Sequence, residues 1–594
     1  MVAEAPETFA SMSENRQRRC AASANMDGVM DDDQRYRAVH SRDARFDGVF
    51  YTAVRTTGVY CRPSCPAVTP KRVNVRFFPT AAAAQESGFR ACKRCRPDLT
   101  PGSPEWNLRA DVVGRAMRLI QDGAVDRGGV SALASAVGYS ERQLNRLLSA
   151  EVGAGPLALA RTERAQTARV LVETTDMPMA DVAFAAGFAS VRQFNETMRA
   201  VFDRSPTEMR TMGNGRAPAS GGVRPAATEP GTVTLRLPYR EPIDLAQMLG
   251  FLGDRAVPGV EEYRDGVYRR TLMLAHGPAV VELSEGSRTG RAGRSRRAGA
   301  AGGARSVGAA DAVDAVDGGV SAGGGGHVLC RLRLSEARDL TSAVRRCRRL
   351  LDLDADPRAV AEALGGDPLL GPIVAAHPGL RSPGHVDPAE LAVRAVLGQQ
   401  VSVRAARTLA GRLVERFGEP LAPGLEAPGG GLTHVFPSPD VLAAADPAGF
   451  SIPVARGRAL AGLCGAIASG WIDLGPGCDR DEVERRLVEL RGIGPWTAGY
   501  VRMRGLGDPD VFLHGDLGVR MALEAGGRRA TPAAAAREAR AWSPWRSYAN
   551  HALWASLADR ARESAAARED VVARKGVRSG SKERQERQER KESA

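Results

Sequence analysis

The chain has few cysteines, few aromatic residues and no long apolar run, and each shortage excludes a class of protein. Only nine cysteines occur among 594 residues, and their clustering excludes a secreted fold built on disulfides. No apolar run is long enough to span a bilayer. The first twenty residues, MVAEAPETFASMSENRQRRC, lack the apolar core of a secretory signal. Together these shortages predict a cytoplasmic protein in a reducing compartment.

What the chain has in excess is positive charge. Lys and Arg total 82 against 69 Asp and Glu, which gives a net charge of +13. This balance favours a polyanionic partner, with nucleic acid as the first candidate. The alternative is a soluble protein with a basic tail. The length is too great for one hydrophobic core, so several domains are expected.

Composition and periodicity divide the chain into segments. We expect a disordered leader at 1–29, a cysteine-bearing domain at 30–101, a helical domain at 107–211, a linker at 212–230, a sheet domain at 231–355 with a disordered insertion at about 286–326, a second helical domain at 356–557 and a charged disordered tail at 558–594. The insertion is rich in Gly, Ala and Arg and cannot bury a core, so we place it in a hairpin loop.

Four cysteines form two close pairs in basic surroundings. Cys61 and Cys65 lie in VYCRPSCPAV, and Cys92 and Cys95 lie in GFRACKRCRPD. This spacing is typical of tetrahedral zinc, and the neighbouring Arg and Lys side chains would stabilise the charge of four thiolates. Spacing alone favours a structural zinc site and does not choose one cysteine over the other three as a reactive group.

The wider context of these cysteines resembles the N-terminal domain of the Ada methylphosphotriester repair proteins. The similarity runs over about residues 30–100, through AVRTTGVYCRPSCPA and NVRFFPTAAAAQESGFRACKRCRPD. It implies one zinc ion held by four cysteines, with Cys61 as the irreversible acceptor of a methyl group from a methylated DNA phosphate. A thiolate that attacks a methyl carbon needs no general base. The transfer would remove one negative charge from a surface that faces phosphates, which raises DNA affinity.

The segment that follows contains two helix-turn-helix patterns. GYSERQLNRLLSAEVG and GFASVRQFNETMRAVF lie about fifty residues apart. One copy fits a generic helical bundle equally well, but two copies resemble the AraC-type DNA-binding domain across 108–211. The resemblance implies that helices at about 140–150 and 190–202 enter adjacent major grooves. The candidate groove contacts, any of which could instead hold phosphate, are Arg142, Gln143, Arg146, Arg192, Gln193 and Asn195.

The second helical domain carries a hairpin followed by a carboxylate. In LRGIGPWTA, Gly492 and Gly494 would bring backbone amides close to a phosphate. Asp516 follows about twenty residues later, in VFLHGD. An ordinary tight turn and a helix N-cap are the plainer interpretations of these two features. In combination they resemble the helix-hairpin-helix base-excision glycosylases.

Residues 231–557 resemble AlkA-type DNA-3-methyladenine glycosylase II, through AVLGQQVSV and WSPWRSYANHALW besides the hairpin. The resemblance implies that Asp516 is the catalytic carboxylate, which stabilises the positive charge on the sugar of a flipped nucleotide. Trp496, Tyr500 and Trp545 match aromatic positions of the base pocket, where a cationic alkylated base would stack. Core packing is the alternative role for each of these aromatic residues.

The chain departs from the related enzymes in three ways. Trp496 stands where bifunctional members carry a nucleophilic lysine, so we expect water as the nucleophile and no strand cleavage. Gln400 stands where the AlkA relative inserts an apolar wedge, and it can fill the gap and hydrogen-bond to the orphan base. The chain lacks Pro-Cys-His-Arg, so repair of alkylated guanine oxygen is not expected. The other cysteines considered, taken as scattered core or surface residues, are Cys330, Cys347, Cys464 and Cys478.

The sequence thus predicts a multidomain, mostly α fold. It comprises a small zinc α+β domain, a tandem helix-turn-helix domain, an α+β sheet domain and an all-α helix-hairpin-helix glycosylase domain. The predicted function is an alkylation-damage response that combines phosphotriester repair, transcriptional activation and monofunctional excision of alkylated purines. The expected partners are double-stranded DNA and RNA polymerase, and the cofactor is one zinc ion. The alternative is a transcriptional regulator with a structural zinc site and an inactive glycosylase fold.

Overall fold

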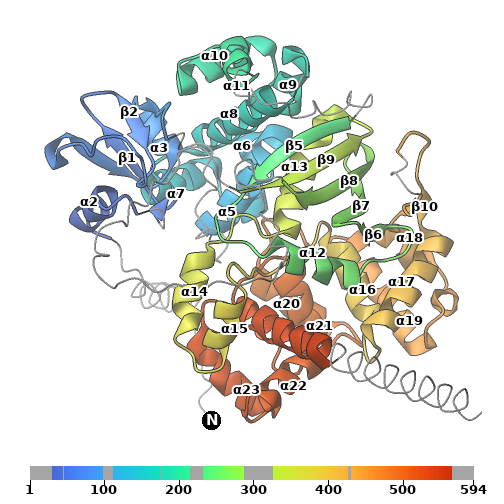
Figure 1. The fold of residues 1–594 in the computed structure, drawn as a ribbon. Helices are drawn as coiled ribbons and strands as arrows, with labels where there is room; N and C mark the ends of the chain where they lie inside the picture. Colours follow the sequence, from blue (N-terminus) through green and yellow to red (C-terminus); the bar gives the residue numbers. More distant parts are fainter. Residues whose placement is uncertain are drawn as a thin grey trace, which may run out of the picture.

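The computed structural model describes residues 30–43, 46–95, 97, 112–175, 177–214, 232–286, 326–425 and 430–564. The expected leader, most of the expected linker and insertion, and the tail beyond 564 lie outside this part of the chain. Within it, four domains pack against one another (Figure 1). None of the helices in these ranges combines the length and the apolar character needed to cross a membrane.

The cysteine domain (residues 30–97) is a four-stranded sheet with two short helices. Its elements are α2 (Asp32–His40), β1 (Tyr51–Val54), β2 (Val59–Cys61), η3 (Arg72–Asn74), β3 (Val75–Phe78), α3 (Ala81–Glu86) and β4 (Arg90–Ala91), with strand order β3-β1-β2-β4. β2 pairs in parallel with β4, which sets Tyr60 beside Ala91. The cysteines that follow these two residues are therefore brought to the same end of the sheet.

The tandem domain (residues 112–214) contains two helix-turn-helix units joined by a long central helix (Figure 1). Its helices are α5 (Val112–Gln121), α6 (Ala124–Val137), α7 (Glu141–Val152), α8 (Pro156–Thr174), α9 (Met179–Ala185), α10 (Val191–Phe202) and α11 (Pro206–Asn214). The second helices of the two units, α7 and α10, begin after Ser140 and Ser190, whose hydroxyls accept hydrogen bonds from the third backbone N–H of each helix. α11 extends into the first residues of the expected linker.

The sheet domain (residues 232–353) is a five-stranded antiparallel sheet with helices on it. Its elements are β5 (Thr232–Pro238), α12 (Leu245–Asp254), β6 (Glu261–Arg264), β7 (Val267–Leu274), β8 (Gly277–Glu285), β9 (His327–Leu334), η5 (Ala337–Asp339) and α13 (Leu340–Leu350), with strand order β5-β9-β8-β7-β6. β8 and β9 pair from Ala279 with Leu334 to Glu285 with Val328. The segment between them therefore joins the adjacent ends of a hairpin, where we expected the insertion.

The hairpin domain (residues 354–564) is helical. Its elements are α14 (Pro357–Gly365), α15 (Leu370–Ala376), α16 (Pro388–Leu397), α17 (Val403–Phe417), β10 (Glu419–Pro420), β11 (His434–Val435), α18 (Pro439–Ala444), η6 (Pro447–Phe450), α19 (Val454–Ala468), α20 (Arg480–Glu489), α21 (Pro495–Tyr500), η7 (Val501–Gly505), α22 (Leu517–Ala525), α23 (Pro532–Glu538) and η8 (Ala539–Trp542). A last helix covers residues 546–564. The hairpin lies between α20 and α21, as the Gly-x-Gly pattern predicted.

The first three domains share one hydrophobic core. A single cluster of buried side chains includes Tyr60 of the cysteine domain, Leu144 of the tandem domain and Leu332 of the sheet domain. The hairpin domain contains two further cores, one around Leu460, which also includes two valines of the sheet domain, and one around Trp542. Burial of apolar surface therefore joins the first three domains and also joins the sheet domain to the hairpin domain.

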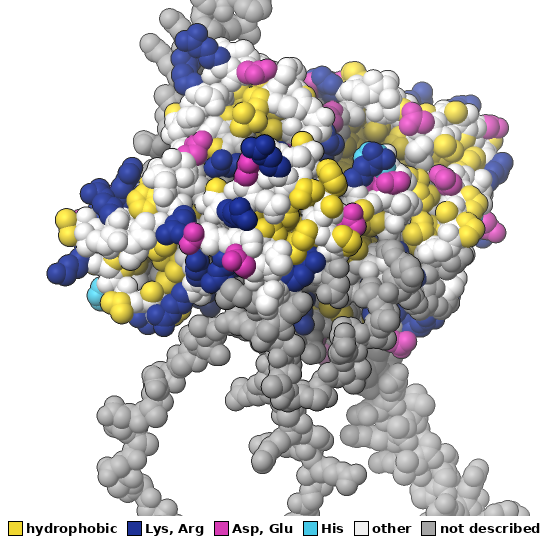
Figure 2. All heavy atoms as spheres, turned by 90° about the horizontal axis from the view of Figure 1, so that it is seen from above, with side chains coloured by type: hydrophobic (Ala, Val, Ile, Leu, Met, Phe, Trp, Pro, Cys, Tyr) yellow, Lys and Arg dark blue, Asp and Glu magenta, His cyan; other side chains and the backbone are white. Residues whose placement is uncertain are grey.

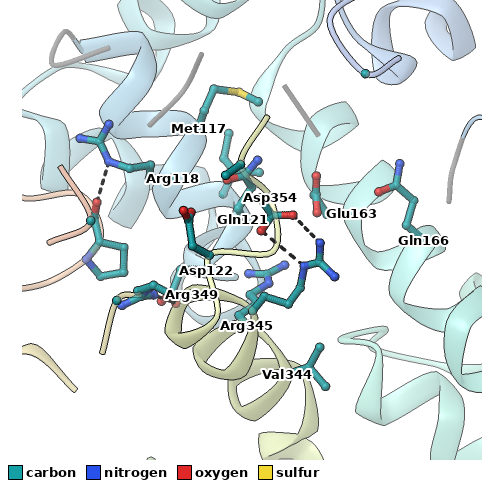
Figure 3. A pocket seen from close by; sticks show the side chains of 18 of the residues that line it. Met117, Arg118, Gln121, Asp122, Glu163, Gln166, Val344, Arg345, Arg349 and Asp354 are labelled. Carbon is teal, nitrogen blue, oxygen red and sulfur yellow. Dashed lines mark hydrogen bonds and ion pairs between the residues drawn. The ribbon is translucent and has the colours of Figure 1, made fainter. Parts of the chain in front are cut away.

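A cavity of about 370 Å³ lies where the four domains meet. Figure 3 shows Arg118 and Glu163 of the tandem domain and Arg345 of α13 around it. Beside it, Nε of Arg118 donates a hydrogen bond of 3.0 Å to the carbonyl oxygen of Pro476, which precedes α20. The tandem domain therefore contacts the segment that leads into the hairpin.

Candidate functional site

Four cysteine side chains converge at one end of the first sheet. The sulfur atoms of Cys61, Cys65, Cys92 and Cys95 all lie within 4.8 Å of one another. Cys61 ends β2, and the backbone N–H of Cys92 donates a hydrogen bond to the carbonyl of Tyr60, which sets the two cysteine loops side by side. Four soft sulfur donors at this separation fit a tetrahedral zinc ion. Cys65 is half-buried and the other three are buried.

A buried carboxylate supports the turn between Cys61 and Cys65. Asp47 accepts hydrogen bonds from the backbone N–H and the hydroxyl of Ser64, at 2.9 and 2.5 Å. Nη1 of Arg62 lies 3.2 Å from the same carboxylate. Burial raises the pKa of Asp47, and the hydrogen bonds from Ser64 partly oppose that rise. The turn is thus fixed by contacts that do not depend on a metal ion.

The expected groove contacts lie at the starts of α7 and α10. Arg142, Gln143 and Arg146 are exposed on α7, and on α10 Arg192 and Gln193 are exposed while Asn195 is half-buried. The Gln143 side chain caps α7 by accepting a hydrogen bond from the Ser140 N–H, and Nε of Arg192 forms an ion pair of 2.9 Å with Glu196. Arg142 and Arg146 are therefore exposed positive side chains on α7.

Hydrogen bonds connect the hairpin to the turn that carries Gln400. Gly492 has φ 92°, and a Cβ atom there would lie 2.7 Å from that of Ala459, so the position requires glycine. Gly494 precedes α21 as its N-cap. Nε2 of Gln399 donates hydrogen bonds of 3.0 Å to the carbonyl of Gly492 and to the hydroxyl of Thr497. Gln400 is exposed at the tip of this turn with φ 58°.

Asp516 is held by three hydrogen bonds. Its Oδ1 accepts from the backbone N–H of Val519 and from Nε1 of Trp554, both at 2.9 Å. Its Oδ2 accepts from Nε1 of Trp496, also at 2.9 Å. Asp516 is thus the N-cap of α22 and also the centre of an aromatic site. A carboxylate can accept about four hydrogen bonds, so Oδ2 retains capacity for one more.

Four aromatic rings follow one another beside this carboxylate. Trp496 and Tyr500, one turn apart on α21, stack with centroids 5.3 Å apart and planes 13° apart. Tyr500 lies 6.5 Å from Trp554, and Trp554 stacks on Phe251 at 6.3 Å. Phe251 belongs to α12, so the site lies at the junction of the sheet and hairpin domains.

The structure does not bring Trp545 to Asp516. Its ring packs edge-on against Tyr548 at 5.4 Å, in the core around Trp542, and it lines the cavity between domains. The third ring near Asp516 is Trp554, from the same sequence run. Neither Trp554 nor Phe251 was predicted from the sequence as a residue of this site. Trp554 could have been considered as the last aromatic residue of WSPWRSYANHALW, whereas no local pattern marks Phe251.

Two arginines hold the aromatic rings in place. Arg504, in the π-helical turn η7, donates a hydrogen bond of 2.8 Å to the hydroxyl of Tyr500. The guanidinium carbons of Arg255 and Arg504 lie 3.7 and 4.9 Å from the centre of the Phe251 ring. Burial acts to raise the pKa of Tyr500, but Arg504 and Arg255 outweigh it, and the pKa is lowered.

His551 packs against two rings of this aromatic cluster. Its ring packs edge-on against Phe251 and Trp554, with centroids 5.2 and 5.0 Å away. Burial and the nearby arginines lower its pKa well below the usual range, so it is uncharged at neutral pH.

The other cysteines are not scattered singly. Cys330 of β9 and Cys347 of α13 are fully buried and adjacent, and contact with the Cys347 thiol together with burial raises the pKa of Cys330 well above its usual range. Cys464 and Cys478 are buried in the hairpin domain. All four behave as small core residues.

Three domain families match the chain. The metal binding domain of Ada matches residues 34–98, a helix-turn-helix domain matches 133–212 and the AlkA N-terminal domain matches 234–387.

One relative matches most of the chain, and two others match parts of it. The chain is 52% identical over 522 residues to a probable bifunctional transcriptional activator/DNA repair enzyme AlkA of Mycobacterium tuberculosis, which covers 88% of this chain and 96% of the relative. It is 34% identical to DNA-3-methyladenine glycosylase 2 of Escherichia coli, over 54% of this chain and 95% of that enzyme. It is 36% identical to the bifunctional activator/repair enzyme Ada of Escherichia coli, over 28% of this chain and 47% of that protein. The chain belongs to the family of bifunctional transcriptional activators and DNA repair enzymes of the AlkA type.

Proposed function

We propose that the hairpin domain excises alkylated purines such as 3-methyladenine from double-stranded DNA, and that the cysteine domain removes methyl groups from DNA methylphosphotriesters. The observation that carries the first activity is the carboxylate of Asp516 held by the indoles of Trp496 and Trp554. The observation that supports the second is the convergence of four cysteine sulfurs.

In base excision, the fixed carboxylate of Asp516 supplies negative charge where positive charge develops. As the bond between sugar and base breaks, the sugar becomes cationic, and a carboxylate already oriented by three donors stabilises it without reorganisation. A base alkylated on a ring nitrogen is itself cationic and stacks well on indole and phenol faces, which Trp496, Tyr500 and Trp554 provide. Gln400, at the tip of its turn, would fill the gap that the flipped nucleotide leaves.

The reaction should stop at an abasic site. Strand cleavage in this superfamily needs an amine that attacks the sugar carbon and forms a Schiff base. Trp496 stands at the corresponding place after the hairpin, and its indole nitrogen is engaged with Asp516. The bond between sugar and base breaks, and the cationic base leaves as a neutral purine with its electron pair. Water adds to the sugar carbon and loses a proton to solvent, and the DNA backbone stays intact.

In phosphotriester repair, the Cys61 thiolate attacks the methyl carbon. A sulfur–carbon bond forms, the carbon–oxygen bond breaks, and the phosphate departs as an anionic diester with the electron pair. Cys61 ends as a thioether, so each chain reacts once. Zinc, when bound by the four cysteines, would keep the sulfur as a thiolate at neutral pH. The basic side chains of this domain would hold the flanking phosphates, and Figure 2 shows several Lys and Arg patches over its end of the molecule.

The tandem domain would convert this repair into transcriptional activation. α7 and α10 would lie in adjacent major grooves of a promoter, with Arg142 and Arg146 as base or phosphate contacts. RNA polymerase is the proposed partner of the DNA-bound activator.

The first experiment measures base release from a duplex that contains 3-methyladenine. Wild type should generate abasic sites, with strand breaks only after alkali, and Asp516→Asn should lower release by at least about 100-fold. Asp440→Asn makes the same change of charge at an exposed position on α18 and should retain wild-type release. No release from the wild type would leave a regulator with an inactive glycosylase fold.

The second experiment measures transfer of a labelled methyl group from a methylphosphotriester duplex to the protein. Wild type should accept one methyl per chain, and Cys61→Ala should accept none. Cys464→Ala removes a buried cysteine far from the cluster in sequence and should accept one methyl. Transfer that persists in Cys61→Ala would assign the acceptor role to another cysteine.

A further inference from the structure

An acidic residue at the C-terminal end of α10 contacts the loop that carries Cys92 and Cys95. Asp203 is the C-cap of α10, and its Oδ2 lies 2.5 Å from Nη1 of Arg90 and 3.0 Å from Nζ of Lys93. Arg90 begins β4, and Lys93 lies between Cys92 and Cys95. α10 packs against β4, so the contact joins the cysteine loop to a helix expected to enter DNA.

Asp203 occupies a position that local physics disfavours for an aspartate. Its φ is 56°, in the left-handed region where glycine or asparagine usually ends a helix. It also places a negative charge at a helix C-terminus, where the helix dipole favours positive charge. Two cations from another domain neutralise the negative charge at this helix end.

The chemistry of this contact is that of a phosphate site. Two cations converge on one carboxylate oxygen, as they would on a non-bridging oxygen of a DNA phosphate. We infer that Arg90 and Lys93 form a binding site for a DNA phosphate, that Asp203 occupies this site in the free protein, and that the DNA backbone displaces Asp203 on binding. This inference rests on the proposed binding of DNA by the cysteine domain and goes beyond the methyl transfer.

The exposure of the three groups fits an exchangeable contact. The side chains of Arg90, Asp203 and Lys93 are 44, 49 and 50% exposed, so the ion pairs lie at the surface. Surface ion pairs contribute little net stability, whereas a polyanion gains affinity by releasing its counterions. DNA can therefore replace Asp203, and the exchange frees the C-terminal end of α10 from the cysteine loop at the moment the duplex binds.

The test is a double-mutant cycle on the full chain with zinc bound. Affinity for an unmodified 30-base-pair duplex of mixed sequence is measured by fluorescence anisotropy between 50 and 200 mM salt. Asp203→Asn keeps a residue suited to positive φ and should bind about two- to fivefold tighter than wild type. Asp181→Asn, exposed on α9, makes the same change of net charge and serves as the matched control.

The paired substitution Arg90→Gln/Lys93→Gln should weaken binding and reduce the salt slope by about 2. In that background Asp203→Asn should give no further gain. Zinc content, measured by release to a chromogenic chelator, should be one per chain in each variant.

Two results would overturn the inference: a gain from Asp203→Asn no larger than that from Asp181→Asn, or a gain that persists without Arg90 and Lys93. No binding by the wild type at any salt concentration would overturn the proposed DNA binding, and this inference with it.

Discussion

Nε1 of Trp554 lies 2.9 Å from Oδ1 of Asp516 and donates a hydrogen bond to it. The bond joins the last helix of the hairpin domain, 546–564, to the start of α22. The same indole stacks on Phe251 of the sheet domain, so one side chain links the carboxylate to the domain interface. Asp516 is therefore oriented by residues from separate parts of the chain. Substitutions at the interface between the sheet and hairpin domains should change the rate of base release.

Trp554→Phe should slow base release without abolishing it. The substitution removes one hydrogen bond to a charged group and keeps a ring beside Phe251, so we expect a loss of about 10- to 100-fold in the single-turnover rate. Trp545→Phe removes an indole from the core that lines the cavity between domains and should release base within about twofold of wild type. The reverse ranking would restore Trp545 as the residue of the base site.

Gln400→Ala should impair excision from duplex DNA more than from single strands. Without a side chain at the tip of the turn, nothing fills the gap left by a flipped base, and we expect about a tenfold loss on duplex. In single strands there is no stacked partner to replace, so Gln400→Ala and wild type should release base at rates that agree within about twofold.

Gln399→Ala provides the comparison for this result, because it breaks the hydrogen bonds of the turn to Gly492 and Thr497 and leaves Gln400 in place. We expect a smaller loss on duplex than with Gln400→Ala. Equal losses on duplex and single-stranded substrates in Gln400→Ala would contradict a wedge role.

Local patterns predicted the parts of these sites that lie close together in sequence. The four cysteines come from two short motifs, and Trp496 and Tyr500 share a helix face because they are one turn apart. The hairpin was recognisable because Gly492 needs a backbone conformation that other residues avoid.

The rest of the site depends on tertiary packing, which leaves no local pattern. Phe251 reaches Trp554 from some 300 positions earlier in the sequence, and Arg118 contacts Pro476 across a separation of 358. Trp545 and Trp554 have the same chemistry and lie in one motif, so only the path of the last helix decides which of them reaches Asp516. The partners of Asp203 likewise come from another domain, so no local pattern marks its contact.

Removal of zinc should affect the two halves of the protein unequally. Structural zinc contributes much of the folding free energy of a small cysteine domain. The two cores of the hairpin domain contain no described residue of the cysteine domain, so base release should stay within about twofold of the untreated protein after chelation. Methyl transfer should be lost, because the thiolates lose their cation. If base release falls in parallel with methyl transfer as chelator is added, loss of zinc from the cysteine domain also destabilises the hairpin domain.

Asp352 should make stability depend on pH in the mildly acidic range. Burial raises its pKa to about 6 from 3.8, although Arg381 and the hydroxyl of Tyr548 act to lower it. The folded state binds the Asp352 proton more tightly than the unfolded state does. Protonation of Asp352 therefore stabilises the fold fully below about pH 4, and this stabilisation is lost as the pH rises through 6. The full change is up to about 3 kcal/mol.

Asp352→Asn imitates the protonated acid and, at φ 47°, suits the backbone. Its urea midpoint should therefore fall less than that of wild type between pH 4 and 8. Asp265→Asn has a similar φ of 55° at an exposed position and should follow the wild-type curve. If Asp352→Asn also follows that curve, Asp352 is ionised in the folded protein throughout this range, and another group is responsible for any pH dependence.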